Sequence, residues 1–408
     1  MIAPATPTGA VVVVSPPQKS GAVRLLSMDT YRGFVMFLMA AEMLRLSQVA
    51  KHFPGNPIWQ LIDFHNSHVA WTGCSLHDLI QPSFSFLVGV ALPFSLAARR
   101  SRGQSFIRML LHAVLRGVLL VLLGVFLRSQ GRAMTRWTFE DTLSQIGLGY
   151  TFLFLLGFMS VRLRWGALIG IFVGYWAFFA TFPIPGPEWT REAANVNPEW
   201  AHDFKGFAAH WNLNANAAWD FDQWFLNLFP REDVFRGNGG GYSTLNFIPT
   251  LATMILGLIA GQWLRDQPGG SALRRMLAAA AICLALGYAL HLSGICPSVK
   301  KIWTPAWVLQ SGGWCFLMMA GFHAVTDVAG LRRWAFPLMI IGMNSIAMYV
   351  MVGTISGYIQ ASIQTHLGAA PFQIAGEIWE PTLRGAATLL TLWLILLWMY
   401  RRKLFLRL

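Results

Sequence analysis

Long apolar segments alternate with short polar connections through most of the chain. A helix that crosses a lipid bilayer needs about 20 mostly apolar residues, and windows of this kind recur from residue 31 to residue 400. We place them near residues 31–50, 78–98, 108–127, 142–161, 166–184, 244–264, 272–293, 305–327, 335–360 and 384–400. Because a helix satisfies its backbone hydrogen bonds internally, this pattern predicts an all-α, polytopic transmembrane helical bundle of about 10 spans.

Two stretches depart from this pattern. Residues 1–23 are rich in Pro, Ala and Val and carry Lys19 as their one charged residue, so we predict a disordered cytoplasmic tail. The remainder, 24–408, is predicted to be a single transmembrane domain. Its one long connection, at about 185–243, is rich in Trp and Asn, which either bind a sugar or pack the loop against the membrane interface.

Composition supports a membrane protein and argues against nucleic acid as a partner. Hydrophobic residues make up 55% of the chain, charged residues make up 12%, and the mean hydropathy is +0.49. The net charge of +13 comes from basic residues that lie between apolar runs and not on a soluble face. The lipid bilayer is therefore the first partner that we expect for this integral membrane protein.

The distribution of Lys and Arg predicts an orientation. Basic residues are concentrated in one alternate set of connections, such as 99–108, 265–275 and 401–407, and are fewer in the other set, which includes Lys300 and Lys301. By the positive-inside rule, both termini face the cytoplasm and the connection at 185–243 lies outside.

A cluster of titratable residues lies at one predicted membrane boundary. It contains His65, His68, His77 and Asp78. A neutral imidazole takes a proton from an attacking amine or is itself acylated, and Asp78 or Asp63 would orient the ring. The alternative is that these histidines are ordinary surface or interfacial residues. Their spacing matches no common zinc pattern and the four cysteines are scattered, so we expect no metal site.

Polar residues inside predicted spans are further candidates, because they are costly in a bilayer. Glu42 would contact substrate or a proton, or would make an interhelical contact. Asn246 and Asn344 would bind a carbonyl or acetamido group, or would join helices. The basic turn at 99–108 would meet the phosphates of a nucleotide-like donor, or anionic lipid.

Four motifs occur in a fixed order along the predicted bundle. They are Ser27-Met28-Asp29-Thr30-Tyr31-Arg32-Gly33, His68-x-x-Trp71-x-Gly73 followed by Asp78-Leu79-x-x-Pro82-x-Phe84, Leu245-Asn246-x-Ile248, and Gly342-Met343-Asn344-Ser345-Ile346. They resemble the motifs of the heparan-α-glucosaminide N-acetyltransferase family, which includes bacterial members. The resemblance covers about residues 24–400 and implies a multi-spanning membrane acyltransferase, here of the bacterial inner (plasma) membrane.

The resemblance also implies roles for particular residues. In that family, an acetyl group passes from cytoplasmic acetyl-CoA to the amine of a terminal glucosamine across the membrane. The active-site histidine of the family falls on His68 and its aspartate on Asp78. The amide positions fall on Asn246 and Asn344, which would line the same cavity and steady the developing oxyanion.

The chain departs from the family pattern around the expected pocket. Thr72 stands where the lysosomal enzyme has Asn, and Gln145 stands in a Leu-Ser-Gln-Ile-Gly segment where that enzyme reads Leu-Gln-Arg-Leu-Gly. Near the end of the first span the family often has an Asn, and this chain reads Ala41-Glu42-Met43. We expect Trp71, Arg32, Gln145 and Glu42, in addition to Asn246 and Asn344, to bind substrate or cofactor. These departures leave the identity of the acceptor open.

The sequence therefore predicts an acetyl-CoA-dependent N-acetyltransferase (acyltransferase), with acetyl-CoA as co-substrate and no metal. The acceptor would be an amino sugar or glycan on the extracytoplasmic side. His68 would act as a general base or as an acetyl-imidazole carrier. The alternative functions are an inner-membrane transporter of amino sugars or oligosaccharides, coupled to protons through Glu42, and a structural subunit of an envelope glycan-export system. The assembly stays open between a monomer and a homodimer.

Overall fold

The computed structural model describes residues 25–406, so the tail predicted at 1–23 lies outside the described residues. The described chain is helical, and its one β-bridge pairs Thr72 with Val299. The main helices are α1 (Leu26–Ala40), α2 (Leu46–Ala50), α3 (Pro57–Asn66), α4 (Ile80–Arg100), α5 (Phe106–Arg128), α6 (Thr142–Phe158), α7 (Val161–Ala180), α8 (Ala217–Leu226), α9 (Phe247–Asp266), α10 (Gly270–Leu292), α11 (Pro305–Phe322), α12 (Phe336–Met343), α13 (Ser345–Thr354), α14 (Ser356–Leu367) and α15 (Glu380–Arg401).

Within the described residues, seven helices are long and apolar enough to cross a membrane. The number becomes eight if Arg333–Met343 and Ser345–Thr354, which are bent by 66°, form one broken span. α1 and α6 have 15 and 17 residues and are shorter than the about 20 residues of a typical span. The predicted all-α transmembrane bundle is therefore confirmed, whereas the number of 10 spans and the cytoplasmic position of both termini remain predictions.

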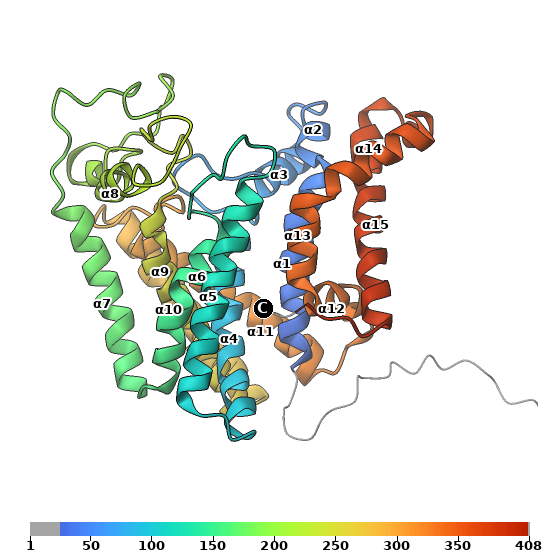
Figure 1. Ribbon diagram of the computed structural model, residues 1–408, viewed down its shortest axis with the longest axis horizontal. Coiled ribbons are helices and arrows are strands. Elements are labelled where there is room, and N and C mark those ends of the chain that lie inside the picture. Colours follow the sequence, from blue (N-terminus) through green and yellow to red (C-terminus); the bar gives the residue numbers. More distant parts are fainter. Residues whose placement is uncertain (1–24, 407–408) are drawn as a thin grey trace, which may run out of the picture.

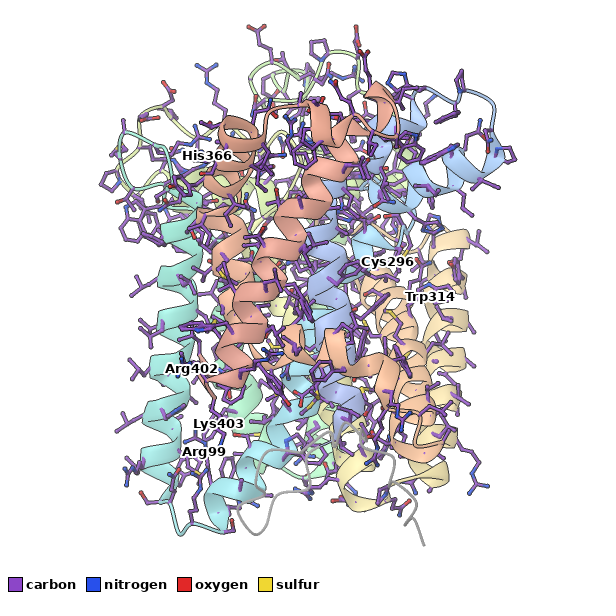
Figure 2. All side chains as sticks on the ribbon, turned by 90° about the vertical axis from the view of Figure 1, so that its right-hand side faces the viewer. Arg99, Cys296, Trp314, His366, Arg402 and Lys403 are labelled. Atoms are coloured by element: carbon purple, nitrogen blue, oxygen red, sulfur yellow. The ribbon has the colours of Figure 1, made fainter. Side chains whose placement is uncertain are left out.

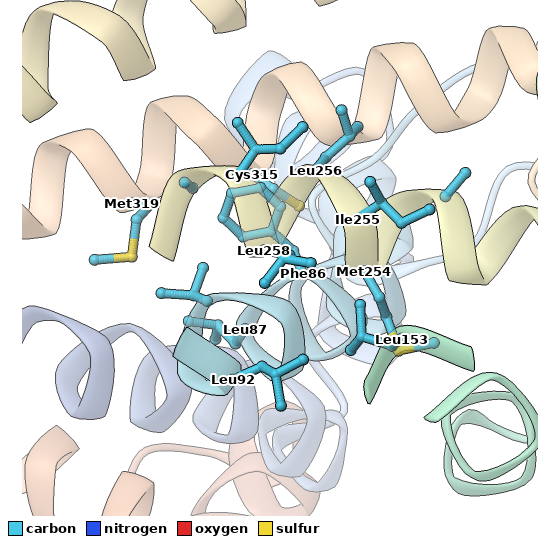
Figure 3. Packing of buried hydrophobic residues seen from close by; sticks show 14 of the residues in the cluster. Phe86, Leu87, Leu92, Leu153, Met254, Ile255, Leu256, Leu258, Cys315 and Met319 are labelled. Atoms are coloured by element: carbon cyan, nitrogen blue, oxygen red, sulfur yellow. The ribbon is translucent and has the colours of Figure 1, made fainter. Parts of the chain in front are cut away.

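α4, α9 and α11 form the centre of the bundle. Figure 3 shows the side chains that meet there, which include Phe86 and Leu87 of α4, Met254, Ile255, Leu256 and Leu258 of α9, and Cys315 and Met319 of α11. A Cβ atom on Gly89 would lie 2.0 Å from the carbonyl oxygen of Met254, and one on Gly257 would lie 1.9 Å from that of Phe86. The two backbones therefore touch, which fixes the start of α4 against α9.

The two ends of the bundle carry different structures. In Figure 1, α2, α3, α8 and α14 lie at the upper end, together with the long connection between α7 and α9. Figure 2 shows His366 at that end, and Arg99, Arg402 and Lys403 at the opposite end. These basic residues come from connections that the charge pattern assigns to the cytoplasm, and they share one end of the molecule.

The Trp-rich connection packs against the upper part of the bundle. Trp211 is fully buried with Trp71, Tyr175 and Phe179 in one apolar cluster. The indole N–H of Trp71 donates to the carbonyl oxygen of Trp211 (3.2 Å). These two indoles therefore hold the connection to the helices.

Candidate active site

The carboxylate of Asp78 is the centre of a polar cluster just before α4. Asp78 lies in a 3₁₀ turn, His77–Leu79, and is fully buried. Its Oδ2 accepts hydrogen bonds from the backbone N–H groups of Ser75 (3.0 Å) and Val69 (3.3 Å). Its Oδ1 lies 2.8 Å from Nδ1 of His68. The loop before α4 thus wraps around a carboxylate whose oxygens both have partners, as buried charge requires.

Lys300 reaches the same carboxylate from the connection between α10 and α11. Its Nζ lies 3.1 Å from Oδ1 of Asp78 and 3.0 Å from Nδ1 of His68, and only 4% of its side chain is exposed. The bridge between Thr72 and Val299 joins the two connections beside this contact. Burial lowers the pKa of Lys300, and the negative charge of Asp78 opposes that shift.

His68 presents its ring to a cavity. Its side chain is 41% exposed, and the carboxylate of Asp78 is nearer to Nδ1 than Lys300 is. An Nδ1–H that donates to Asp78 leaves Nε2 as the basic nitrogen. Partial burial lowers the pKa of His68, the hydrogen bond to Asp78 opposes this, and the positive charge of Lys300 lowers the pKa further. The neutral, basic form of the ring is therefore favoured.

A second histidine–carboxylate pair lies beside the first. Nε2 of His77 lies 2.6 Å from Oε1 of Glu42, which belongs to a 3₁₀ turn after α1, and the His68 and His77 rings have centroids 4.5 Å apart. His65, by contrast, uses its Nδ1 to accept the backbone N–H of Leu76 (3.0 Å) and so shapes the loop.

His68 of the first pair and both members of the second pair line one cavity, which we call the histidine cavity. Its volume is about 330 Å³. Its polar lining residues are Glu42, His68, His77, Gln81, Arg128, Glu140, Asp141, Thr142, Tyr242, Lys300 and Tyr349.

A second cavity, the arginine cavity, follows α4 toward its other end. Its volume is about 550 Å³, and its charged or titratable lining residues are Asp29, Arg32, Arg99, Arg102, His112, Arg116, Tyr150 and Tyr349. Phe84, Thr142 and Tyr349 line both cavities. The two cavities therefore meet at these three side chains.

The structure brings some of the sequence-predicted residues together. His68 and Glu42 line the histidine cavity, and Asp78 is hydrogen-bonded to His68. Arg32 lines the arginine cavity, where its guanidinium lies 3.6 Å from the carboxylate of Asp29.

The other predicted residues bind the protein's own backbone. Trp71 anchors the long connection, as described above. Nδ2 of Asn246 donates to the carbonyl oxygen of Lys301 (2.7 Å), and Nε2 of Gln145 donates to those of Phe139 (2.6 Å) and Thr244 (3.1 Å). Asn344, between α12 and α13, donates to the carbonyl oxygen of Leu404 (3.0 Å) and accepts the N–H of Leu406 (3.1 Å). Their expected roles toward substrate remain predictions.

Lys300 is the residue that the sequence analysis did not select. It lies 232 residues from His68 in the chain, and in the sequence it appears only as one of two adjacent lysines in a short connection. In the sequence, a lysine that is buried within a connection looks the same as an exposed one. Only the contact between the two connections reveals it.

Cys74 is the thiol nearest to the cluster in sequence. Burial raises the pKa of Cys74 to about 12, and the charge of Asp78 adds to this effect. The thiolate needed for nucleophilic attack is therefore scarce at neutral pH. Within residues 25–406, no group of three or more His, Cys, Asp or Glu side chains is arranged to hold a metal ion.

The fold and the cluster together define a polytopic helical membrane protein with a His–Asp–Lys cluster at the histidine cavity, which adjoins the arginine cavity. No protein family model matches the chain. It is 23% identical over 368 residues to the human heparan-alpha-glucosaminide N-acetyltransferase, covering 80% of this chain and 52% of that protein. It is 23% identical over 378 residues to the mouse protein of the same name, covering 82% of this chain and 54% of the relative.

The chain is thus a distant homologue of the heparan-alpha-glucosaminide N-acetyltransferases. It spans about half the length of the curated relatives that it matches.

Proposed function

We propose that the protein transfers an acetyl group from acetyl-CoA, bound in the arginine cavity, to an amino sugar or related glycan bound in the histidine cavity. The observation that carries the proposal is that these two cavities, different in charge, meet at Phe84, Thr142 and Tyr349 near the His68–Asp78 pair. The names of the relatives supply the class of reaction.

The arginine cavity suits a long, phosphate-bearing donor. Its lining within α4 runs from Phe84 to Arg99, which corresponds to roughly 22 Å at about 1.5 Å per helical residue, and Arg102 follows in the turn after the helix. Arg99, Arg102 and Arg116 offer guanidinium groups, which bind phosphate oxygens in a bidentate manner. The phosphates of acetyl-CoA would lie at this basic end, and the thioester would lie near Phe84.

His68 would act as the general base. Its Nε2 takes a proton from the acceptor nitrogen as the new N–C bond forms, and Asp78 stabilises the resulting imidazolium. The C–S bond then breaks, and His68 returns the proton to the departing CoA sulfur. The alternative, in which Nε2 first carries the acetyl group, uses the same residue and the same cavity.

The test is acetyl transfer by the purified protein with radiolabelled acetyl-CoA and glucosamine. The wild type should form N-acetylated product and release CoA, and His68→Ala should lower the rate by about a hundredfold or more. His52→Gln, at an exposed position outside both cavities, is the matched control.

Two further readouts distinguish a general base from an acetyl carrier, and an acyltransferase from a transporter. Labelled protein formed without acceptor would identify His68 as a carrier. If the wild type yields no more product and CoA than His68→Ala, the acyltransferase proposal fails, and glucosamine uptake into proteoliposomes would then support the transporter.

A further inference from the structure

The proposed reaction with an amine has two protons to move. A primary amine acceptor is largely an ammonium ion at neutral pH and has no lone pair for attack. The balanced reaction is R–NH₃⁺ + CH₃CO–SCoA → R–NH–COCH₃ + HSCoA + H⁺. His68 moves the second proton from nitrogen to sulfur and ends the cycle neutral, so the first proton needs another acceptor.

The histidine cavity contains a second histidine–carboxylate pair, which lies close enough to His68 to receive this proton. The imidazole of His77 is 8% exposed and hydrogen-bonded at 2.6 Å to Glu42, whose side chain is 60% exposed. Both line the same cavity as His68, and the two imidazole rings have centroids 4.5 Å apart. The pair therefore runs from an imidazole beside the proposed base to an exposed carboxylate.

We propose that His77 and Glu42 form the second base of the site, which takes the first proton from the acceptor's ammonium group and releases it to water. This inference rests on the proposed function. The proton moves from the ammonium nitrogen to His77 and then, through Glu42, to the solvent. The acceptor nitrogen is left with the lone pair that attacks the thioester.

The charges of the cavity support a role for Glu42 in binding a cation. Lys300 is held by Asp78. The other charged lining groups are Arg128 from the end of α5, and Glu140 and Asp141 from the connection before α6. Glu42 adds an exposed negative charge, which attracts an ammonium group. The pair would therefore favour protonated amines over neutral acceptors or hydroxyl groups.

The sharpest variant removes the charge of Glu42 and keeps a polar side chain of similar size. Glu42→Asn retains a side chain that accepts a hydrogen bond, but it carries no charge and takes up no proton. His77→Gln tests the other member of the pair. His52→Gln again serves as the control.

The experiment compares acetyl transfer to glucosamine, a protonated amine, with transfer to aniline, which is neutral at pH 7. Glu42→Asn and His77→Gln should lower kcat/KM for glucosamine by up to about tenfold at pH 7, because roughly one-tenth of an amine with a pKa near 8 is already free base at that pH. The loss for aniline should be much smaller. Raising the pH should restore glucosamine activity in both variants, because the free amine then forms in solution. An equal loss with both acceptors, or no recovery at high pH, would overturn the proposal.

A binding measurement separates this proposal from the proposed function. Calorimetric titration of glucosamine into the protein, in two buffers with different heats of ionisation, counts the protons released. The wild type should release protons on binding, and both variants should not. Proton release on binding without acetyl transfer would support the second base and contradict the proposed acyltransferase function. Wild-type binding without proton release, or no binding, would reject the second base.

Discussion

His68 works as a base only while its imidazole is neutral. Partial burial and Lys300 lower the pKa of His68, so the neutral form persists below the usual value of about 6.5. Activity should therefore be constant at neutral pH and fall as the pH drops through the lowered pKa. The acidic limb of a plot of kcat/KM against pH should lie below about pH 6.5.

Lys300→Met should move this acidic limb to higher pH. The substitution removes a positive charge that disfavours the imidazolium and leaves Asp78 to stabilise it. The rate of modification of His68 by diethyl pyrocarbonate, followed by mass spectrometry against pH, reports the same titration without turnover. A limb that stays in place in both measurements would contradict the role of Lys300.

The structure brings together three residues that the sequence selected on different grounds, and their roles stay predictions. His68 and Asp78 belong to a titratable cluster at a predicted membrane boundary, in which the resemblance singled out His68, and Glu42 is a polar residue inside a predicted span. Asn246 and Asn344 were selected as polar residues in predicted spans and Gln145 as a departure from the family pattern, and in the structure their amides bind backbone groups. A buried amide has the same sequence signature in both roles, so only its partners distinguish them.

The packing of α4 on α9 holds the cluster in place, because His77 and Asp78 directly precede α4. Gly89→Val would drive a side chain into the backbone of α9 at Met254 and should cost about 1–3 kcal/mol or more. Thermal unfolding in detergent should show a lower Tm. Gly170→Ala on α7, where a Cβ would meet nothing within 4 Å, should leave the Tm unchanged or slightly higher. Equal effects of the two substitutions would contradict the close approach.

α8 carries a buried carboxyl that destabilises the fold at high pH. Asp222 accepts the N–H of Thr244 (2.9 Å) at Oδ2, while its buried Oδ1 lacks a hydrogen-bond partner among the described residues, and burial raises its pKa to about 7. In the unfolded chain an Asp ionises near pH 3.9, so stability should fall as the pH rises from about 4 to 7.

Asp222→Asn should remove this pH dependence. The amide resembles the protonated acid, so the variant and the wild type should have similar Tm values near pH 4. At pH 8 the variant should be more stable, by at most about 4 kcal/mol for a shift of about three pKa units. A wild type that matches the variant at pH 8 would show that Asp222 is not shifted.

The sequence predicted most elements from their apolar length, but not the break between α12 and α13. The window at 335–360 was continuous, whereas the structure bends by 66° at Asn344. The backbone of Asn344 leaves the helical region (φ −126°, ψ 38°). Its side-chain amide binds backbone groups of the segment after α15. That contact is between residues 60 positions apart and has no local signal.

Across the whole molecule, α4 links the two cavities. His77 and Asp78 lie before its first residue and Arg99 lies near its last, so the two ends of one helix separate the proposed acceptor from the donor phosphates. The grouping of Arg99, Arg402 and Lys403 at the donor end, seen in Figure 2, agrees with a cytoplasmic source of acetyl-CoA. With the proposed function, this arrangement leads us to expect that the acetyl group crosses the membrane.

Sided proteoliposomes distinguish acetyl transfer across the membrane from transfer on one side. A reporter at residue 210 fixes the orientation, acetyl-CoA is supplied only on the side of Arg99, and glucosamine only on the opposite side. We expect N-acetylglucosamine on the glucosamine side and free CoA on the other side, and neither product with His68→Ala. Product that forms only when donor and acceptor share one side of the membrane would contradict this expectation.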